Sequence, residues 1–396
     1  MISDKWFRAK VLGELAPRLP GREQADVLRE ALSAARAISY EQDRAEVLGE
    51  LAPRLPKHEQ ANVLREALAA AHAISNELNR AFALGELAPQ LPKHEQANLL
   101  REALALASAM IDEGPRTSVL EKLALRLPEN LLGEALALAN AISDEGSRAR
   151  VLGKLASRLP EREQAKVLEE ALALARTISD EGTRAYAFWE LAPRLPESLL
   201  GEALTLARTI FDEWSRARVL VAIAPRLPER DQAMVFGEAL ALAPAISDEE
   251  CRAEVLVAIA PWLPECDQAS VFREALALVP AIIDDEGRVI VLRKLAPSLP
   301  ESLLGEALQM ARTRCHSDES IVVLSNLATR WSAVCRSTQR SEFEELSATL
   351  RAFARTKRPQ LLHAIQALLP VIAEHGGLPA LRETARAIVD TAKWWP

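Results

Sequence analysis

The chain has 396 residues, of which 49% are hydrophobic and 26% charged, a balance typical of a folded globular protein and not of a disordered chain. Alanine, leucine, glutamate and arginine dominate, whereas runs of β-branched residues are nearly absent, so we expect an all-α protein. The net charge of −8 argues against binding of nucleic acid or anionic membranes through a large basic surface.

An arginine recurs along the chain and opens each copy of a repeat. The spacing is 36 residues, as from Arg8 to Arg44, or 32 residues, as from Arg116 to Arg148, and such periods are typical of helical solenoids. A tenth, degenerate copy places Ser320 at this position. The opening arginines are Arg8, Arg44, Arg80, Arg116, Arg148, Arg184, Arg216, Arg252 and Arg288.

Each copy predicts two helices joined at a proline. Apolar residues such as Val47, Leu51 and Leu55 recur on one helical face, and a second such stretch follows Pro56. Proline suits the first turn of a helix, because its missing N–H would have had no partner there. In five copies a serine of the turn before the first helix is the expected N-cap: Ser39, Ser75, Ser143, Ser179 and Ser247.

The shorter copies lack four residues at the start of the second stretch, where LPKHEQANVLREAL is reduced to LPENLLGEAL. Four residues are about one helical turn, so we expect these second helices to lose a turn and keep their apolar face. We therefore predict a right-handed α-solenoid of about ten helical hairpins over residues 1–340, with capping helices over residues 341–396. Within the cap, helices are expected at 342–355, 359–374 and 378–393. The first hairpin has no polar cap of its own, so we expect a preceding domain or a partner to cover it.

Two charges recur in every copy, the opening arginine and a glutamate of the second helix. For Arg148 and Glu170 and their equivalents we expect an Arg–Glu ladder along the stack, because partly buried charges need partners. The alternative is a row of arginines that binds phosphates.

Four positions of the first helix vary freely while its core does not: two before the opening arginine and two, five and six after it. They form one stripe on the helix, and glycine at the fifth position, as in Gly153, indicates close approach of a neighbouring backbone. Extended stripes of this kind line the binding surfaces of solenoids. The alternative is that the large side chains fill gaps between copies. The candidate binding residues on the stripe are Trp6, Phe82, Tyr186, Trp189, Trp214 and Arg218.

Catalytic and metal-binding patterns are absent from the sequence, which has no phosphate loop, nucleophile elbow or HExxH helix. Cys315, His316 and Cys335 lack a fourth ligand and a suitable spacing for zinc. We expect no enzyme activity, no cofactor and no metal. No stretch resembles a signal peptide or a membrane span, and the four cysteines form no CxxC pair, so we expect a cytoplasmic protein without membrane contact.

The tandem LAPRLP units and the closing ALLPVIAEHGGLPALRETARAIVDTAKWWP resemble the C-terminal repeat tracts of large bacterial proteins. Similar tracts follow STAND-type NTPase modules or protease, TIR and other effector-associated modules. The resemblance implies a HEAT- or TPR-like sensor or scaffold arm of a signalling or defence system, with an effector or NTPase module fused or encoded nearby. The predicted function is therefore non-enzymatic binding of a protein or peptide, and the alternative is a nucleic-acid-binding helical repeat.

Overall fold

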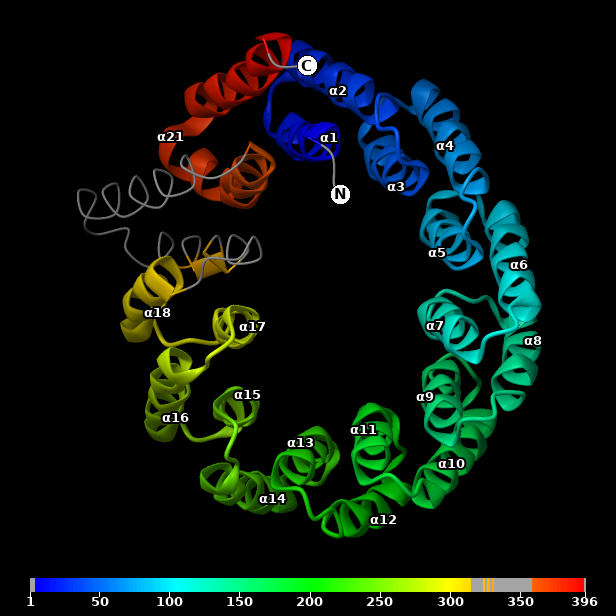
Figure 1. The fold of residues 1–396 in the computed structure, drawn as a ribbon, viewed down its shortest axis with the longest axis vertical. Helices are drawn as coiled ribbons and strands as arrows, with labels where there is room; N and C mark the ends of the chain where they lie inside the picture. Colours follow the sequence, from blue (N-terminus) through cyan, green and yellow to red (C-terminus); the bar gives the residue numbers. More distant parts are fainter. Residues whose placement is uncertain (1–3, 315–322, 325, 328–329, 331–357, 395–396) are drawn as a thin grey trace. The chain divides into compact units, whose positions relative to one another are not determined.

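The computed structural model describes residues 4–314, 323–324, 326–327, 330 and 358–394, and in these residues all regular secondary structure is helical (Figure 1). Nine helical hairpins follow one another in the described part of the chain. The prediction of an all-α solenoid is confirmed. The tenth copy at Ser320, the helix expected at 342–355 and the boundary expected near residue 340 lie outside the described residues.

The first helix of most hairpins begins at an acidic residue after a turn and is followed by a short 3-10 turn or a tight turn. In the common sequence Ala-Pro-Arg the proline lies in the first turn of the 3-10 segment. Because proline has no backbone N–H to donate, it disfavours continuation of the preceding α-helix. The first helices are α1 (Asp4–Leu15), α3 (Glu41–Leu51), α5 (Glu77–Leu87), α7 (Glu113–Leu123), α9 (Glu145–Ala156), α11 (Glu181–Leu191), α13 (Glu213–Ile223), α15 (Glu249–Ile259) and α17 (Asp285–Leu295).

The second helix usually starts directly after the second proline of the repeat, as α8 starts after Pro128. α6 and α10 have 17 residues, whereas α8 and α12, which belong to short copies, have 12 and 11. The expected loss of a helical turn is confirmed in these two copies. The second helices are α2 (Gly21–Arg36), α4 (Lys57–His72), α6 (Lys93–Ala109), α8 (Glu129–Asn140), α10 (Glu161–Thr177), α12 (Glu197–Ala207), α14 (Glu229–Leu242), α16 (Glu265–Leu278) and α18 (Glu301–Arg314).

The chain forms two compact units, a central unit of residues 72–271 and a terminal unit that joins residues 1–71 to residues 272–396. In the central unit α5, α7, α9, α11, α13 and α15 each pack against the next and form the inner layer of an arc (Figure 1). The second helices form its outer layer. Alanine and leucine fill the space between the layers, and Leu152 and Leu155 are fully buried there. Small side chains let the helices lie close together.

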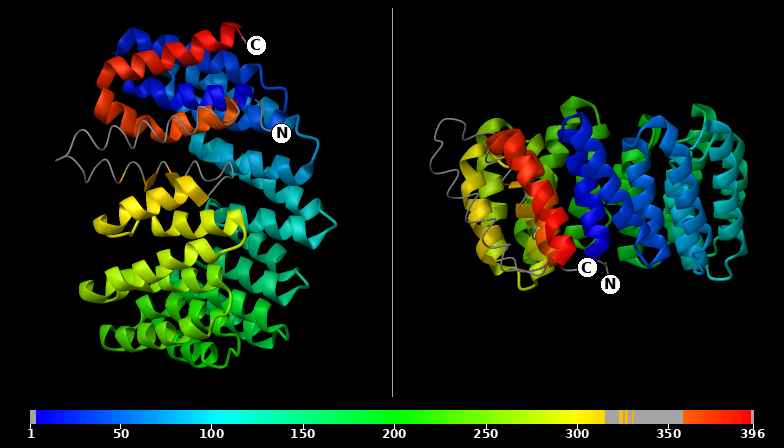
Figure 2. Two further views of the ribbon diagram at one scale, coloured as in Figure 1. Left: turned by 60° about the vertical axis from the view of Figure 1, so that its left-hand side comes forward. Right: turned by 90° about the horizontal axis from the view of Figure 1, so that it is seen from above.

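The terminal unit contains a long C-terminal helix, α21 (Arg358–Trp394), which bends at Gly377, where φ is 58°. The bend lies in the break that was expected between the helices at 359–374 and 378–393. α21 packs against α1 and the turn that follows it (Figure 2). Arg382 donates two hydrogen bonds of 2.7 Å to the Glu23 carboxylate, and Gln366 donates one of 2.7 Å to Glu14. The first hairpin, expected to be covered by another domain or a partner, is thus covered by this chain's own helix.

Aspartate, and not the predicted serine, caps most of the first helices. Asp144 accepts a hydrogen bond of 2.7 Å from the Ser147 backbone N–H, and Asp180 accepts one of 2.8 Å from that of Thr183. Ser143, the expected cap, lies one residue earlier, and its N–H and hydroxyl donate to Glu113 instead. Serine and aspartate are both good N-caps, so the sequence could not show which of these two neighbouring residues occupies the N-cap position.

Most of the opening arginines bond to a backbone carbonyl and not to the glutamate of the predicted ladder. Arg8 does reach Glu30. Arg148, however, donates to the Ile142 carbonyl at 3.2 Å, in the turn that enters its own helix. Charged donors bind such otherwise unpaired carbonyls well, so these arginines stabilise the turn between copies. The same bond to a carbonyl six residues upstream is formed by Arg44, Arg80, Arg184, Arg216 and Arg288.

The recurrent glutamate of the second helix pairs instead along the outer layer. Arg208, near the end of α12, donates to Glu238 of α14, with a shortest N–O distance of 2.8 Å. In the terminal unit Arg36 pairs in the same way with Glu66, also at 2.8 Å. These pairs are largely exposed, so each contributes little to stability.

Candidate binding surface

Glycine at the fifth position after the opening arginine lets consecutive first helices touch. A Cβ atom on Gly153 of α9 would lie 2.4 Å from the Leu191 side chain of α11, and Gly85 faces Leu123 at the same distance. The sequence indicated a close neighbour at these glycines, and the structure shows one, but it is a leucine side chain of the next first helix and not its backbone. As a result, stripe residues of neighbouring copies come within contact distance of one another.

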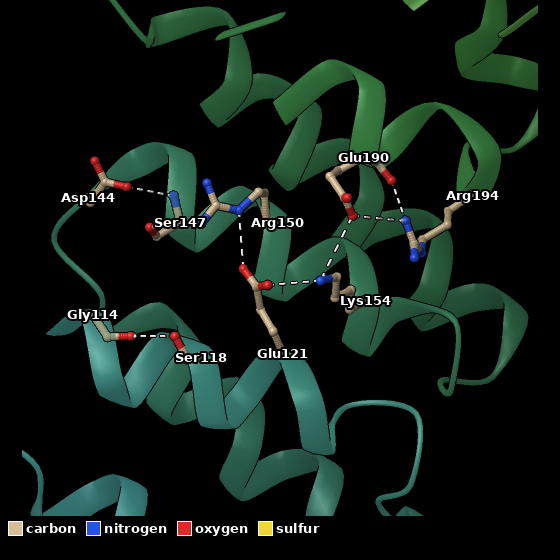
Figure 3. A network of polar contacts seen from close by, with 9 residues as sticks. All are labelled: Gly114, Ser118, Glu121, Asp144, Ser147, Arg150, Lys154, Glu190 and Arg194. Atoms are coloured by element: carbon tan, nitrogen blue, oxygen red, sulfur yellow. Dashed lines mark hydrogen bonds and ion pairs between the residues drawn. The ribbon is translucent and has the colours of Figure 1, made fainter. Parts of the chain in front are cut away.

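A network of charged side chains crosses α7, α9 and α11 (Figure 3). Glu121 accepts hydrogen bonds from Arg150 at 3.1 Å and from Lys154 at 2.8 Å. Lys154 also lies 3.9 Å from Glu190, and Arg194 lies 3.8 Å from the same carboxylate. Each cation of this charged network therefore has a carboxylate partner, and the side chains hold one another in place.

Next to the charged network lies a cluster of aromatic and arginine side chains. The rings of Tyr186 and Trp189 on α11 are 5.6 Å apart between centroids. The Arg218 guanidinium of α13 lies 4.3 Å from the Trp189 ring and 4.6 Å from the Trp214 ring. Arg150 lies 5.2 Å from the Tyr186 ring and joins this aromatic–arginine cluster to the charged network. Cations at such distances from a ring face are attracted to it.

The aromatic–arginine cluster is open to solvent. Tyr186 is 40% exposed, and Trp189, Trp214 and Arg218 are half-buried. The cluster is carried by α11 and α13, which pack against helices of the outer layer and belong to the inner layer of the arc (Figure 1). The side chains of the cluster therefore pack partly against one another and are partly accessible to a ligand.

Arg218 differs from the cations of the charged network. Its contacts within the described ranges of the chain are with the faces of the two indole rings, and no carboxylate pairs with it there. A guanidinium group carries five N–H donors in its own plane, and stacking against rings leaves these edges free. The Trp214 indole Nε1 is also buried without an acceptor among the described residues.

The other two predicted residues lie apart from the cluster. Phe82 of α5 is half-buried and lies 4.6 Å from Lys122 of α7. Trp6 belongs to the terminal unit, where Lys10 lies 4.4 Å from its ring. Burial is the largest single influence on Lys10 and opposes its charge, but the hydrogen bonds and negative charges of Glu46 and Glu50 together outweigh burial, so the pKa of Lys10 is raised. Each of the five predicted aromatic residues therefore has a basic side chain against its ring.

The basic partners Lys10, Arg150 and Lys122 all occupy stripe positions, two or six residues after an opening arginine, but the sequence analysis gave them no role. The available signal was their position. Arg150, Tyr186 and Arg218 all lie two residues after an opening arginine, in three consecutive copies. The sequence does not give the distance between neighbouring first helices. The structure does, and it shows that these residues come into contact.

In the part of the chain that the structure describes, no group of three or more His, Cys, Asp or Glu side chains is placed to hold a metal ion. None of the described helices has the length and hydrophobicity of a bilayer-spanning segment.

Comparison with known proteins yields no protein-family profile and no curated protein that matches the chain. Solved structures are similar only at a distance. Ton1535 from Thermococcus onnurineus NA1 is 14% identical over 76% of this chain and 94% of its own, with a TM-score of 0.34. A chain from a structure of Kap95p with RanGDP is 13% identical over 96% of this chain and 60% of its own, with a TM-score of 0.38. A circular tandem repeat protein with novel repeat topology is 15% identical over 98% of this chain and 97% of its own, with a TM-score of 0.25.

Proposed function

We propose that this chain is a scaffold that binds a protein or peptide partner and has no enzyme activity. The observation that carries the proposal is the aromatic–arginine cluster on α11 and α13. Tyrosine, tryptophan and arginine dominate the energy of protein interfaces, because they bury a large area at a small cost in side-chain entropy. Stacking already orders Trp189, Arg218 and Trp214, which lowers that cost further.

The resemblance of the repeats supports a finer version of the proposal. We propose that the array is the sensor or scaffold arm of a bacterial signalling or defence system and acts in the cytoplasm. An effector or NTPase module, fused or encoded nearby, would then act on the signal. The unpaired thiols of Cys251 and Cys266 are compatible with a reducing compartment.

The test is a selection from a library of displayed random 12-residue peptides. The library is selected in parallel against the unmodified chain and against a triple variant, Tyr186→Ala, Trp189→Ala and Trp214→Ala. Peptides enriched on the unmodified chain should bind the triple variant at least tenfold more weakly, because the rings supply most of the contact area. The helical circular-dichroism signal should stay unchanged, since no helix loses its backbone hydrogen bonds.

Tyr40→Ala and Phe211→Ala provide the matched controls. Both side chains are more exposed than Tyr186, at 54% and 82%, and lie outside the cluster, so these variants should bind the peptides as the unmodified chain does. Equal enrichment on the unmodified chain and the triple variant would contradict the proposal. Binding of pooled RNA that needs the same three rings would favour the nucleic-acid alternative.

A further inference from the structure

The charges around the cluster are unevenly matched. The group has four cations. Arg150 and Lys154 lie on α9, Arg194 lies in the turn after α11, and Arg218 lies on α13. Two carboxylates, Glu121 and Glu190, face the first three of them. The group thus has an excess of two positive charges in a chain whose net charge is −8.

The unmatched cation is the one between the two indole rings. Arg218 is half-buried, so it has lost part of its hydration, and its attraction to the two indole rings compensates for that loss only in part. Its N–H edges are held in a fixed plane and have no acceptor in the described residues. A carboxylate matches two parallel N–H donors of a guanidinium, and such paired hydrogen bonds are among the strongest between side chains.

We infer that the partner is an acidic peptide segment that places an Asp or Glu carboxylate against the edge of Arg218. This inference rests on the proposed function and names the chemistry of the partner. Trp189 and Trp214 contact the apolar atoms on either side of that carboxylate, while Tyr186 extends the contact along α11. The acidic stretch lies over α9, α11 and α13, where contacts between rings and guanidinium groups join Arg150, Tyr186 and Arg218 into one surface.

A nucleic acid fits this surface less well. One free guanidinium cannot replace the row of phosphate contacts on which nucleic-acid affinity depends, and each cation of the charged network already has Glu121 or Glu190 as a partner.

The experiment is a double-mutant cycle on a peptide selected with the unmodified chain. The peptide is made with its acidic residue and with the matching amide, Glu→Gln or Asp→Asn, and each form is titrated against the unmodified chain and the Arg218→Gln variant. The fluorescence of Trp189 and Trp214 reports binding. We expect the amide peptide to bind the unmodified chain at least tenfold more weakly, and the Arg218→Gln variant to bind both peptides equally.

Arg230→Gln is the control, because it removes the same charge from a side chain that is 84% exposed on α14, and it should leave the tenfold difference intact. Arg218→Lys should lose most of the difference, because an ammonium group lacks the paired donors. Enriched peptides that need the three rings but are indifferent to Arg218→Gln would overturn the acidic partner and leave the proposed function standing. If the triple variant enriches the same peptides as the unmodified chain, the proposed function fails and the acidic partner fails with it. RNA binding that depends on Arg218 would also overturn the inference.

Discussion

The space beside each stripe position decides which residue the first helix tolerates. Gly153 of α9 receives the Leu191 side chain of α11, which is fully buried and cannot move away without disturbing its neighbours. Glycine in a helix costs about 1 kcal/mol relative to alanine, so its use here reflects packing and not helix preference. At the equivalent position of α11 the chain has the half-buried Trp189, and the contact with the next copy is made by its ring and Arg218 of α13.

Gly153→Ala should therefore lower the free energy of unfolding by about 1–3 kcal/mol, because the new methyl group would overpack the contact with Leu191. Gly201→Ala in α12 is the matched control. A Cβ atom there meets nothing within 4 Å, so this variant should be more stable by up to about 1 kcal/mol. Denaturant unfolding followed by circular dichroism measures both changes. A Gly153→Ala variant as stable as Gly201→Ala would show that the helices separate freely.

The stripe itself was visible in the sequence, because its residues vary against a constant core. The role of the opening arginine was not, because its acceptor is a carbonyl group. All residues have one, so the partner of Arg148 depends on the path of the turn at Ile142 and not on residue type. The stacking of Arg218 between Trp189 and Trp214 was likewise hidden, since it needs the distance between two copies.

Among the elements, the helices and their lengths followed closely from the sequence, because proline and the apolar period mark both ends of each helix. α8 and α12 are shorter than α6 and α10 by about one turn or more and still form the second helices of their hairpins, as the four-residue deletions predicted. The caps were predicted one residue too early. Ser143 and Asp144 are both suitable, and only the structure shows which of them has the extended backbone of an N-cap.

Asp144→Ala should destabilise the chain by about 1 kcal/mol at neutral pH, because the Ser147 N–H at the start of α9 loses its acceptor. Asp144→Asn is the control: an amide oxygen can still accept, as Asn76 does at α5, so most of the stability should remain. Denaturation midpoints of the three chains measure these effects.

The pH dependence of the same cap has a defined sign. Hydrogen bonds from Ser147 lower the pKa of Asp144 below its ordinary value of 3.8. The charged cap therefore contributes its full stability above pH 3.8 and loses it as the pH falls through the lower value of the folded state. The difference in the free energy of unfolding between the unmodified chain and Asp144→Ala should therefore become smaller as the pH falls below 3.8. A deficit that persists below the folded-state pKa would mean that the carboxylate charge is not what stabilises α9.

For the whole molecule, contacts between neighbouring copies were predictable, whereas the contact between α21 and the first hairpin was not. Repeat periodicity reports only what recurs, and the bonds from Gln366 to Glu14 and from Arg382 to Glu23 occur once. The helices on both sides of Gly377 were expected, but nothing in the pattern says where they pack. This is why a partner seemed necessary for α1.

Glu23→Arg should release α21 from α2, because it places two arginines opposite each other. Backbone amides of α1 and α2 should then exchange hydrogen faster, and the added change Arg382→Glu should restore their protection by reversing the pair. Hydrogen-exchange mass spectrometry measures the effect. Protection that stays low in the doubly changed chain would show that the pair does not hold the contact.

Acid should weaken the same contact. The hydrogen bond from Arg382 lowers the pKa of Glu23 below its ordinary value of 4.5. The pair is fully formed above pH 4.5 and is lost as the pH falls through the lower folded-state value. Protection of α1, corrected for the intrinsic exchange rate, should fall in this range, and constant protection would contradict the role of Glu23.

The position of α21 has a consequence for synthesis on the ribosome. Each hairpin can pack on its predecessor soon after it is made, but Glu23 and Arg382 are 359 residues apart in the chain. At typical elongation rates of 5–20 residues per second, the first hairpin waits roughly 20 to 70 s for the helix that covers it. During that interval the apolar side of α1 is accessible to chaperones and to other nascent chains, so this hairpin is covered long after it has been made.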